Sequence, residues 1–233
     1  MKMSEIGLLN EKPLHASLKE WYAQPGDTFE VSVDGYVIDI VREDLLLEIQ
    51  TSGFSSIKSK LQCLANKHRV RLVYPIAREK WIVKPTKDNS GNFTRRKSPK
   101  RGRVEDLFRE MVSFPQLLVN PNFSLEVLMI REEEVRRHEE KRIWRRRGWT
   151  TEERRLLEVI DRHMFEKPSD WLALLPLNMG ESFTTGDLAE AMGIKRRLAQ
   201  QMAYCLRMVS VIELTGRQGR SHTYSVAGNR SVV

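Results

Sequence analysis

The sequence predicts an α/β fold in which helices flank a mixed sheet, followed by a smaller helical module that closes with two short strands. Residues 28–33 alternate apolar and polar side chains as a strand does. The Asp34-Gly35 dipeptide, typical of a two-residue hairpin turn, then leads into the apolar-rich residues 36–41. Residues 55–68 instead place apolar side chains at helical spacing. Strand alternation and helical spacing within the first 70 residues together indicate an α/β core.

The remaining elements follow from the same patterns. An N-terminal helix places Leu14, Leu18, Trp21 and Tyr22 at helical spacing and ends at Pro25-Gly26. Further strands are expected at 45–51, 70–76, 81–83 and 125–130, a helix at 105–112, and a loop at 84–103. The first domain is therefore expected to span residues 1–136.

The composition favours a polyanionic partner. The 233 residues include 39 Lys and Arg against 31 Asp and Glu, which gives a net charge of +8. Basic proteins gain affinity for nucleic acids because each neutralised phosphate releases condensed counterions. Cys63 and Cys205 are expected to be free thiols, since they lie far apart within apolar helical patterns. No apolar run is long enough to span a bilayer, so a cytoplasmic location is expected.

Two carboxylates are expected to lie side by side in the sheet. Asp39 shares a strand face with Val37 and Val41, while Glu48 and Gln50 share a face of the next strand. Close carboxylates repel each other, and a divalent cation relieves that repulsion. All-oxygen ligands favour Mg²⁺ or Mn²⁺ over zinc. The alternative is that these acids pair with a buried Arg or Lys.

The stretch VDGYVIDIVREDLLLEIQT resembles the core of the PD-(D/E)XK restriction-endonuclease-like superfamily, which includes archaeal Holliday-junction resolvases. The pattern is an acid in the second strand, Glu-x-Lys in the third, then a helix and a fourth strand. Here it reads Asp39 and Glu48-Ile49-Gln50, and the resemblance covers roughly residues 11–83. It implies a Mg²⁺-dependent endonuclease with Asp39 and Glu48 as metal ligands and Gln50 in the catalytic site.

This chain departs from the family pattern at the lysine, which is Gln50 here. Lys60 is the best local replacement because it borders the buried stripe of the following helix, although an ordinary surface lysine explains it equally well. Family members also tend to have a glutamate in the first helix. Glu11 and Glu20 are nine residues apart, so at about 100° per residue they point to opposite faces of the helix. Glu11 falls on the face of Leu14, and Glu20 points to water. Glu11 is therefore expected to join the site.

Two basic segments follow the predicted core. The expected loop at 84–103 suits a mobile arm that follows a DNA backbone, through Arg95, Arg96, Lys97, Lys100, Arg101 and Arg103. Residues 137–149 continue a charge-dense stretch in which glutamates and arginines alternate, which indicates a charged helix or linker.

The C-terminal domain is expected to span residues 150–233 and to begin with a helix at 152–164. The pattern FTTGDLAEAMGIKRRLAQQMAYCLRMVSVIEL and a following hairpin resemble a winged helix-turn-helix. The resemblance implies double-stranded DNA as the partner, contacted by Lys195, Arg196 and Arg197 at the start of the second helix and by Arg217 and Arg220 at the hairpin tip. Winged helices also serve as protein-interaction or dimerisation modules.

The sequence thus favours a metal-dependent DNA endonuclease whose C-terminal module binds DNA. Two alternatives remain: a catalytically inactive DNA-binding protein that keeps the nuclease fold, and an assembly subunit that binds a protein partner. The Gln50 substitution favours the first of these alternatives.

Overall fold

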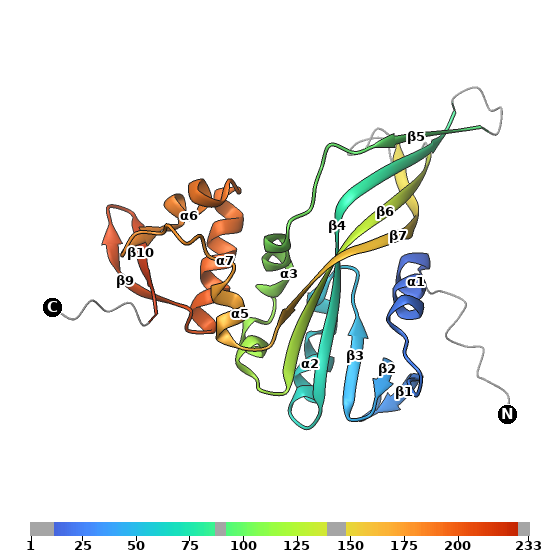
Figure 1. Cartoon of the computed structure of the whole chain (residues 1–233), viewed down its shortest axis with the longest axis horizontal. Helices are drawn as coiled ribbons and strands as arrows, with labels where there is room; N and C mark the ends of the chain where they lie inside the picture. Colours follow the sequence, from blue (N-terminus) through green and yellow to red (C-terminus); the bar gives the residue numbers. More distant parts are fainter. Residues whose placement is uncertain (1–11, 87–91, 139–147, 228–233) are drawn as a thin grey trace. The chain divides into compact units, whose positions relative to one another are not determined.

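The computed structural model describes residues 12–86, 92–138 and 148–227 (Figure 1). Residue contacts divide the chain into two compact units. The first contains the described residues up to Thr51 together with Val73–Val104 and Val127–His163, and the second contains Ser52–Leu72, Glu105–Glu126 and the residues from Met164 onward. Three of the five boundaries fall within long strands of the main sheet, at residues 72–73, 126–127 and 163–164.

The predicted order of a helix, three strands, a helix and a strand is confirmed. These elements are α1 (Pro13–Tyr22), β1 (Thr28–Val33), β2 (Tyr36–Arg42), β3 (Leu45–Ile49), α2 (Lys58–Ala65) and β4 (Arg69–Pro85). They are followed by β5 (Phe93–Lys97), α3 (Phe108–Met111), β6 (Phe123–His138) and β7 (Trp149–Phe165). Within the described residues the main sheet has seven strands in the order β1-β2-β3-β4-β6-β7, with β5 paired to β4.

The β1–β2 hairpin forms at the predicted turn. Asp34 and Gly35 both have positive φ, 50° and 83°, as a type I′ turn requires. Val33 pairs with Tyr36 directly beside the turn, and Thr28 pairs with Val41 at the far end. The dipeptide therefore fixes the register of the first two strands.

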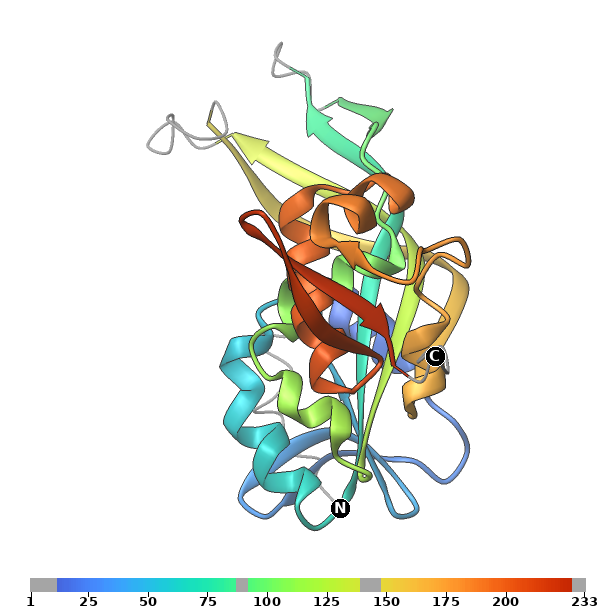
Figure 2. The same ribbon diagram turned by 90° about the vertical axis from the view of Figure 1, so that its left-hand side faces the viewer.

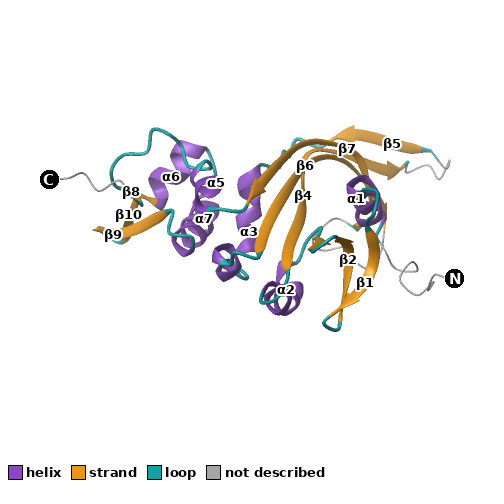
Figure 3. Cartoon of the chain, turned by 60° about the horizontal axis from the view of Figure 1, so that its bottom comes forward, coloured by secondary structure: helices purple, strands orange, loops and turns teal. Residues whose placement is uncertain are grey.

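Helix α1 packs against the sheet of the first unit, where Figure 3 shows it on one side of the curved strands. Its buried Leu14, Leu18 and Tyr22 belong to a cluster with residues of four strands: Ile40, Leu47, Ile49, Val73, Leu128 and Ile130. Apolar burial of this kind drives folding. The apolar face predicted for α1 is thus confirmed at Leu14, Leu18 and Tyr22, whereas Trp21 is exposed.

Strand β7 corrects the prediction of a helix at 152–164. The segment pairs with β6 at the edge of the sheet, and Leu156 and Val159 pack against the core cluster of the first unit. Arg154 bonds Glu132 of β6, and Arg131 of β6 bonds Glu158. Pairing with a distant strand overrides local helical periodicity because packing and cross-strand contacts outweigh the small intrinsic preference.

The segment 84–103 is also not a plain loop. Strand β4 runs without interruption from Arg69 to Pro85, and β5 pairs back onto it with Trp81 opposite Lys97. Beyond β5, the Gly102 amide donates to Ala77 O at 2.9 Å. A Cβ at Gly102 would lie 2.6 Å from that oxygen, so the close approach requires glycine.

The second unit contains a small three-stranded antiparallel sheet with the order β8-β10-β9. Its elements are α5 (Pro168–Leu172), β8 (Phe183–Thr184), α6 (Thr185–Met192), α7 (Arg196–Met208), β9 (Ile212–Gln218) and β10 (Ser221–Val226). Figure 2 shows the β9–β10 hairpin beside α7. The predicted inner face of α7 is buried at Leu198, Met202, Cys205 and Leu206.

Helix α6 has well-defined ends. Thr184 Oγ1 accepts from the amides of Gly186 and Asp187, and the Asp187 carboxylate accepts from the Thr184 amide, which forms a capping box. Gly193 ends the helix with φ 61° and ψ 36°. Glycine suits this position because it adopts the left-handed conformation without strain.

Both cysteines are free thiols, as expected. Burial raises the pKa of the Cys205 thiol to about 12. Among the described residues, no helix combines the length and apolar character needed to cross a membrane.

Candidate functional site

Asp39 of β2 and Glu48 of β3 each lie one residue beyond the end of the paired part of these antiparallel strands. Strands β2 and β3 pair Arg42 with Leu45 and Ile40 with Leu47. If that register continued by one residue, Asp39 and Glu48 would lie opposite each other, with Cβ atoms about 4.5–5.5 Å apart. At this point the Asp39 Oδ2 accepts a hydrogen bond from the Ile49 backbone amide. A common surface for the two carboxylates therefore stays a prediction.

The Asp39 carboxylate is held by two neighbours. Its Oδ2 accepts a hydrogen bond from the Ile49 amide at 2.7 Å and lies 3.2 Å from His15 Nε2. His15 stands on α1 one residue after Leu14, which is buried in the core, so the packing of the helix positions the imidazole. The contact of His15 with Asp39 joins residues 24 positions apart and is a feature of the folded chain.

Glu48 and Gln50 lie at the end of β3. Glu48 is buried, with 7% of its surface exposed, and Gln50 is half-buried. The Gln50 backbone amide donates to Val73 O at 2.9 Å and so connects this end of β3 to β4. Alternation along the strand directs Glu48 and Gln50 to the same side. A Gln50 side chain beside the two carboxylates is what this alternation predicts.

The roles of two further predicted site residues stay predictions. Glu11 lies outside the described residues. Lys60 is half-buried on α2, which belongs to the second unit, and its catalytic role stays a prediction.

The donor set suits a hard divalent cation. Asp39, Glu48 and Gln50 offer only oxygen ligands from their carboxylates and amide, and Mg²⁺ commonly binds through one or two carboxylates while it keeps several waters. Within the described ranges, no group of three or more His, Cys, Asp and Glu side chains is arranged to hold a metal. The chemistry of the side chains fits Mg²⁺, with two carboxylates supplied by the strands.

The basic residues of β5 are engaged by their neighbours. Arg95 pairs with Glu133 at 2.7 Å and Lys97 with Glu79 at 2.9 Å. Both cations also stack on Trp81, at 5.0 and 5.1 Å from the ring centroid. The prediction of a mobile arm is therefore wrong for these two residues, because strand pairing and acidic neighbours fix them.

A second group of cations lies on the opposite face of β5. The register places Arg96 opposite Ile82, on the face that also carries Lys84. The pKa of Lys84 is lowered by its burial and by the charges of Arg136 and Arg96, while its ammonium group sits 4.2 Å above the Trp149 ring. Three cations thus approach one another here, which suits a polyanion. Beyond β5, Lys100, Arg101 and Arg103 are exposed.

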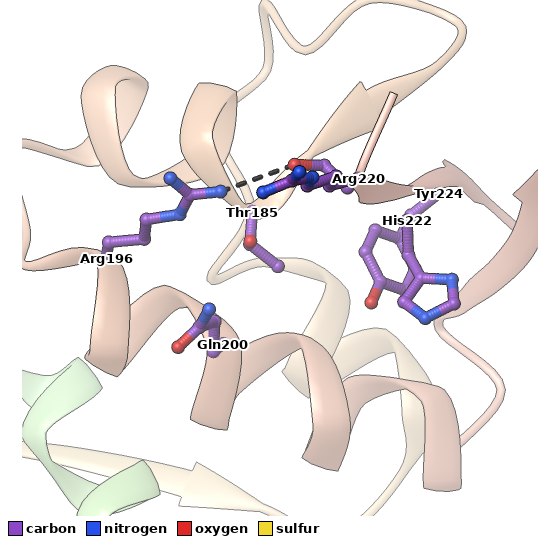
Figure 4. Close-up of a pocket in the computed structure, with 7 residues that line it drawn as sticks. Thr185, Arg196, Gln200, Arg220, His222 and Tyr224 are labelled. Atoms are coloured by element: carbon purple, nitrogen blue, oxygen red, sulfur yellow. Dashed lines mark hydrogen bonds between the residues drawn. The ribbon is translucent and has the colours of Figure 1, made fainter. Parts of the chain in front are cut away.

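In the second unit, a cavity of about 210 Å³ opens between the start of α7 and the β9–β10 hairpin (Figure 4). Arg196 begins α7, Arg220 lies at the hairpin turn, and Arg196 Nη2 donates to Ser221 Oγ at 3.3 Å. The other lining residues are Thr185, Gln200, His222 and Tyr224. The fold therefore joins Arg196 and Arg220, two of the five DNA contacts predicted for the C-terminal domain.

The other three predicted contacts, Lys195, Arg197 and Arg217, are exposed and do not line the cavity. Sequence reasoning missed His222 and Gln200. Their signal was weak: His222 follows the basic hairpin turn by two residues, and Gln200 lies one helical turn after Arg196.

Comparison with known proteins identifies the family. Residues 12–166 match a family model described as a domain of unknown function, DUF8091. The chain belongs to this family. The DUF8091 match contains the acidic pair and all seven strands of the main sheet, and it ends before α5.

A protein of Treponema pallidum (strain Nichols), described as an uncharacterized protein, is 30% identical to this chain over 221 residues. The similarity covers 94% of this chain and 86% of that protein, so it extends well beyond the DUF8091 match. No solved structure matches the chain.

Proposed function

We propose that this protein is a metal-dependent DNA endonuclease that hydrolyses phosphodiester bonds and binds double-stranded DNA through a C-terminal winged helix. The observation that supports the proposal is the antiparallel pairing of β2 with β3 up to Ile40 and Leu47, because continuing it by one residue would bring Asp39 beside Glu48, with Gln50 on the same side by strand alternation. This arrangement agrees with the resemblance of residues 11–83 to the PD-(D/E)XK superfamily.

The chain's own groups have distinct roles in this proposal. The Asp39 and Glu48 carboxylates would hold Mg²⁺ or Mn²⁺, while the Ile49 amide and His15 keep Asp39 in place. The bound cation lowers the pKa of a water and stabilises charge on a phosphoryl oxygen. Gln50 would orient the scissile phosphate or the water. Lys60 and Glu11 are proposed as further members of the catalytic group.

The C-terminal part of the proposal rests on element order and charge. The sequence of elements is α5, β8, α6, α7, β9 and β10, the helix–strand–helix–helix–strand–strand order of a winged helix. Arg196 begins the second helix of the proposed helix-turn-helix, and Arg220 lies at the hairpin turn. A recognition helix enters the major groove with its N-terminal residues, where basic side chains reach bases and phosphates.

The nuclease proposal is tested by cleavage of plasmid and branched DNA in Mg²⁺ or Mn²⁺. Asp39→Asn and Glu48→Gln remove one charge each and keep the side-chain shape, and each is expected to lower cleavage at least about 100-fold. Glu20→Gln, an exposed carboxylate on α1, is the matched control and should cleave like wild type. Equal cleavage by the Asp39→Asn/Glu48→Gln double variant would remove the assignment.

A second candidate is a DNA-binding protein that keeps the nuclease fold without activity. The observation that favours it is the engagement of Asp39 Oδ2 by Ile49 N–H and His15, which gives the carboxylate a structural role. Titration calorimetry with Mn²⁺ separates the two candidates. A nuclease binds Mn²⁺ in a way that depends on Asp39 and Glu48, whereas the inactive scaffold shows no such binding.

A further inference from the structure

The cavity of the second unit is lined by two guanidinium groups from different elements. Arg196 comes from α7 and Arg220 from the turn between β9 and β10, and Figure 4 shows both side chains directed to the same side of the cavity above Thr185. Residues 24 positions apart in sequence thus bring two positive charges to one small volume. Like charges placed together are unfavourable unless an anion or a carboxylate lies between them.

No carboxylate lines this cavity, and within the described part of the chain neither Arg196 nor Arg220 forms an ion pair. This differs from the first unit, where arginines bond acidic partners: Arg42 bonds Asp27, Arg131 bonds Glu79 and Arg154 bonds Glu132. The two cavity arginines therefore keep their guanidinium groups available for a ligand anion.

The remaining lining groups are polar and neutral. Thr185 and Ser221 offer hydroxyl groups, Gln200 an amide and His222 an imidazole, beside the buried ring of Tyr224. Guanidinium groups match the geometry of phosphate oxygens, and hydroxyl and amide groups supply further hydrogen bonds. At about 210 Å³ the cavity is smaller than the roughly 300–1,000 Å³ pockets that hold drug-sized ligands. The size suits a single phosphate group and part of its sugar.

We infer that this cavity is a phosphate-binding site, in which Arg196 and Arg220 hold one phosphate group. The inference deepens the proposed function, since it rests on DNA as the source of the phosphate. A phosphodiester of duplex DNA and the phosphate of a free mononucleotide share the same chemistry, and the experiment below separates them.

The test follows the full-length ¹⁵N-labelled protein by NMR, through the side-chain Nε–Hε signals of Arg196 and Arg220 and the amide signal of Ser221. Three probes are titrated at constant ionic strength: inorganic phosphate, deoxyadenosine monophosphate and a short DNA duplex, with chloride as the reference anion. Arg196→Gln and Arg220→Gln are the test variants. Arg207→Gln is the matched control, because Arg207 is exposed in the last turn of α7 and does not line the cavity.

The expected result is a saturable shift of these signals with a phosphate-bearing probe, with affinity lowered at least about tenfold in both test variants and within about twofold of wild type in Arg207→Gln. A response to the duplex identifies a backbone phosphate, and a response to the mononucleotide alone identifies a free ligand. Shifts that equal those with chloride, or that persist in both test variants, would overturn the inference.

The outcomes separate this site from the proposed nuclease. If DNA cleavage depends on Glu48 but no phosphate probe shifts the signals of the cavity, the phosphate-binding inference is wrong and the nuclease proposal is supported. Phosphate binding by a protein that cleaves no DNA would support the cavity and remove the nuclease.

Discussion

His15 Nε2 on α1 lies 3.2 Å from Asp39 Oδ2 on β2, so one contact joins the first helix to the acidic pair. The same carboxylate oxygen accepts the Ile49 amide at 2.7 Å. Asp39 therefore connects three elements of the first unit: α1, β2 and β3. Its loss should affect the geometry of the sheet as well as any chemistry at its surface.

The His15 contact is expected to stabilise the fold. His15→Ala should lower the free energy of unfolding by about 1–2 kcal/mol, because it removes a partly buried hydrogen bond to a carboxylate. Urea denaturation at pH 7 measures the change. Glu20→Ala, at an exposed position of the same helix, is the control and should stay within about 0.5 kcal/mol of wild type. A His15→Ala variant as stable as that control would show that the contact contributes nothing.

The pair formed by Asp27 and Arg42 should make stability depend on pH. Arg42 donates from Nε and Nη2 to the two carboxylate oxygens, each at 2.8 Å, and these hydrogen bonds lower the pKa of Asp27 below its ordinary value of 3.8. Because the folded state has the lower pKa, the stabilisation is fully present above pH 3.8. It is lost as the pH falls through the folded pKa.

Asp27→Asn is therefore expected to be less stable than wild type by about 2 kcal/mol at pH 7, and the difference should shrink as the pH falls below 3.8. Urea denaturation from pH 7 to pH 3 follows the difference. Glu20→Gln controls for the loss of a carboxylate. A difference that stays constant over this range would contradict the linkage.

Lys80 is expected to stabilise the folded protein by pairing with two buried glutamates of β6. Its ammonium group lies 2.8 Å from Glu132 Oε1 and 2.8 Å from Glu134 Oε2, and both glutamates are buried. Burial would raise the pKa of Glu134, but hydrogen bonds from Lys80 and Arg136 hold it at about 2. The Glu134 contribution is thus fully present above its ordinary pKa of 4.5 and is lost as the pH falls through about 2.

Lys80→Met should destabilise the protein by about 3 kcal/mol at pH 7, because two buried carboxylates then face each other without that cation. The loss should be smaller at low pH, because removal of the Lys80 hydrogen bond raises the pKa of Glu134 and lets its carboxylate take up a proton. Lys80→Arg keeps the charge and is the control. If Lys80→Met does not fold, the Lys80→Met/Glu134→Gln double variant should recover stability, and a failure to recover would contradict this account.

The sequence predicted the first strands correctly because turn chemistry and strand alternation are local rules. The Asp34-Gly35 turn fixes β1 against β2, and β2 pairs with β3 as expected, whereas the common face of Asp39 and Glu48 stays a prediction. The helix ends at Thr184 and Gly193 were also predictable, since capping chemistry is local.

Strand β7 could not be predicted in the same way. Leu156 and Val159 satisfy a helical period, and the charges around them suit an exposed helical face. What decides the strand is β6, where Glu132 and Glu134 are buried and neutralised by Lys80, Arg154 and Arg136. These partners come from three separate parts of the sequence, so no local window contains the reason for the strand.

The turn between α6 and α7 offers a test of local backbone conformation. Gly193 has φ 61°, and a Cβ added there would meet nothing within 4 Å. Gly193→Ala is therefore expected to lower the free energy of unfolding by about 1 kcal/mol through the left-handed conformation alone, without a steric clash. Gly193→Asn should lose less, because asparagine tolerates this conformation better.

Gly180→Ala is the matched control for this turn. Its added Cβ would lie 3.7 Å from Ser182 O, an ordinary contact, and Gly180 lacks the left-handed φ of Gly193. The control should match wild type or gain stability, since alanine restricts the unfolded chain. Thermal and urea unfolding of the three variants measure the order, and the expected ranking is Gly180→Ala above Gly193→Asn above Gly193→Ala. Equal stability of Gly193→Ala and Gly180→Ala would mean that the turn adopts another conformation at little expense, because the expected difference rests on the positive φ of Gly193.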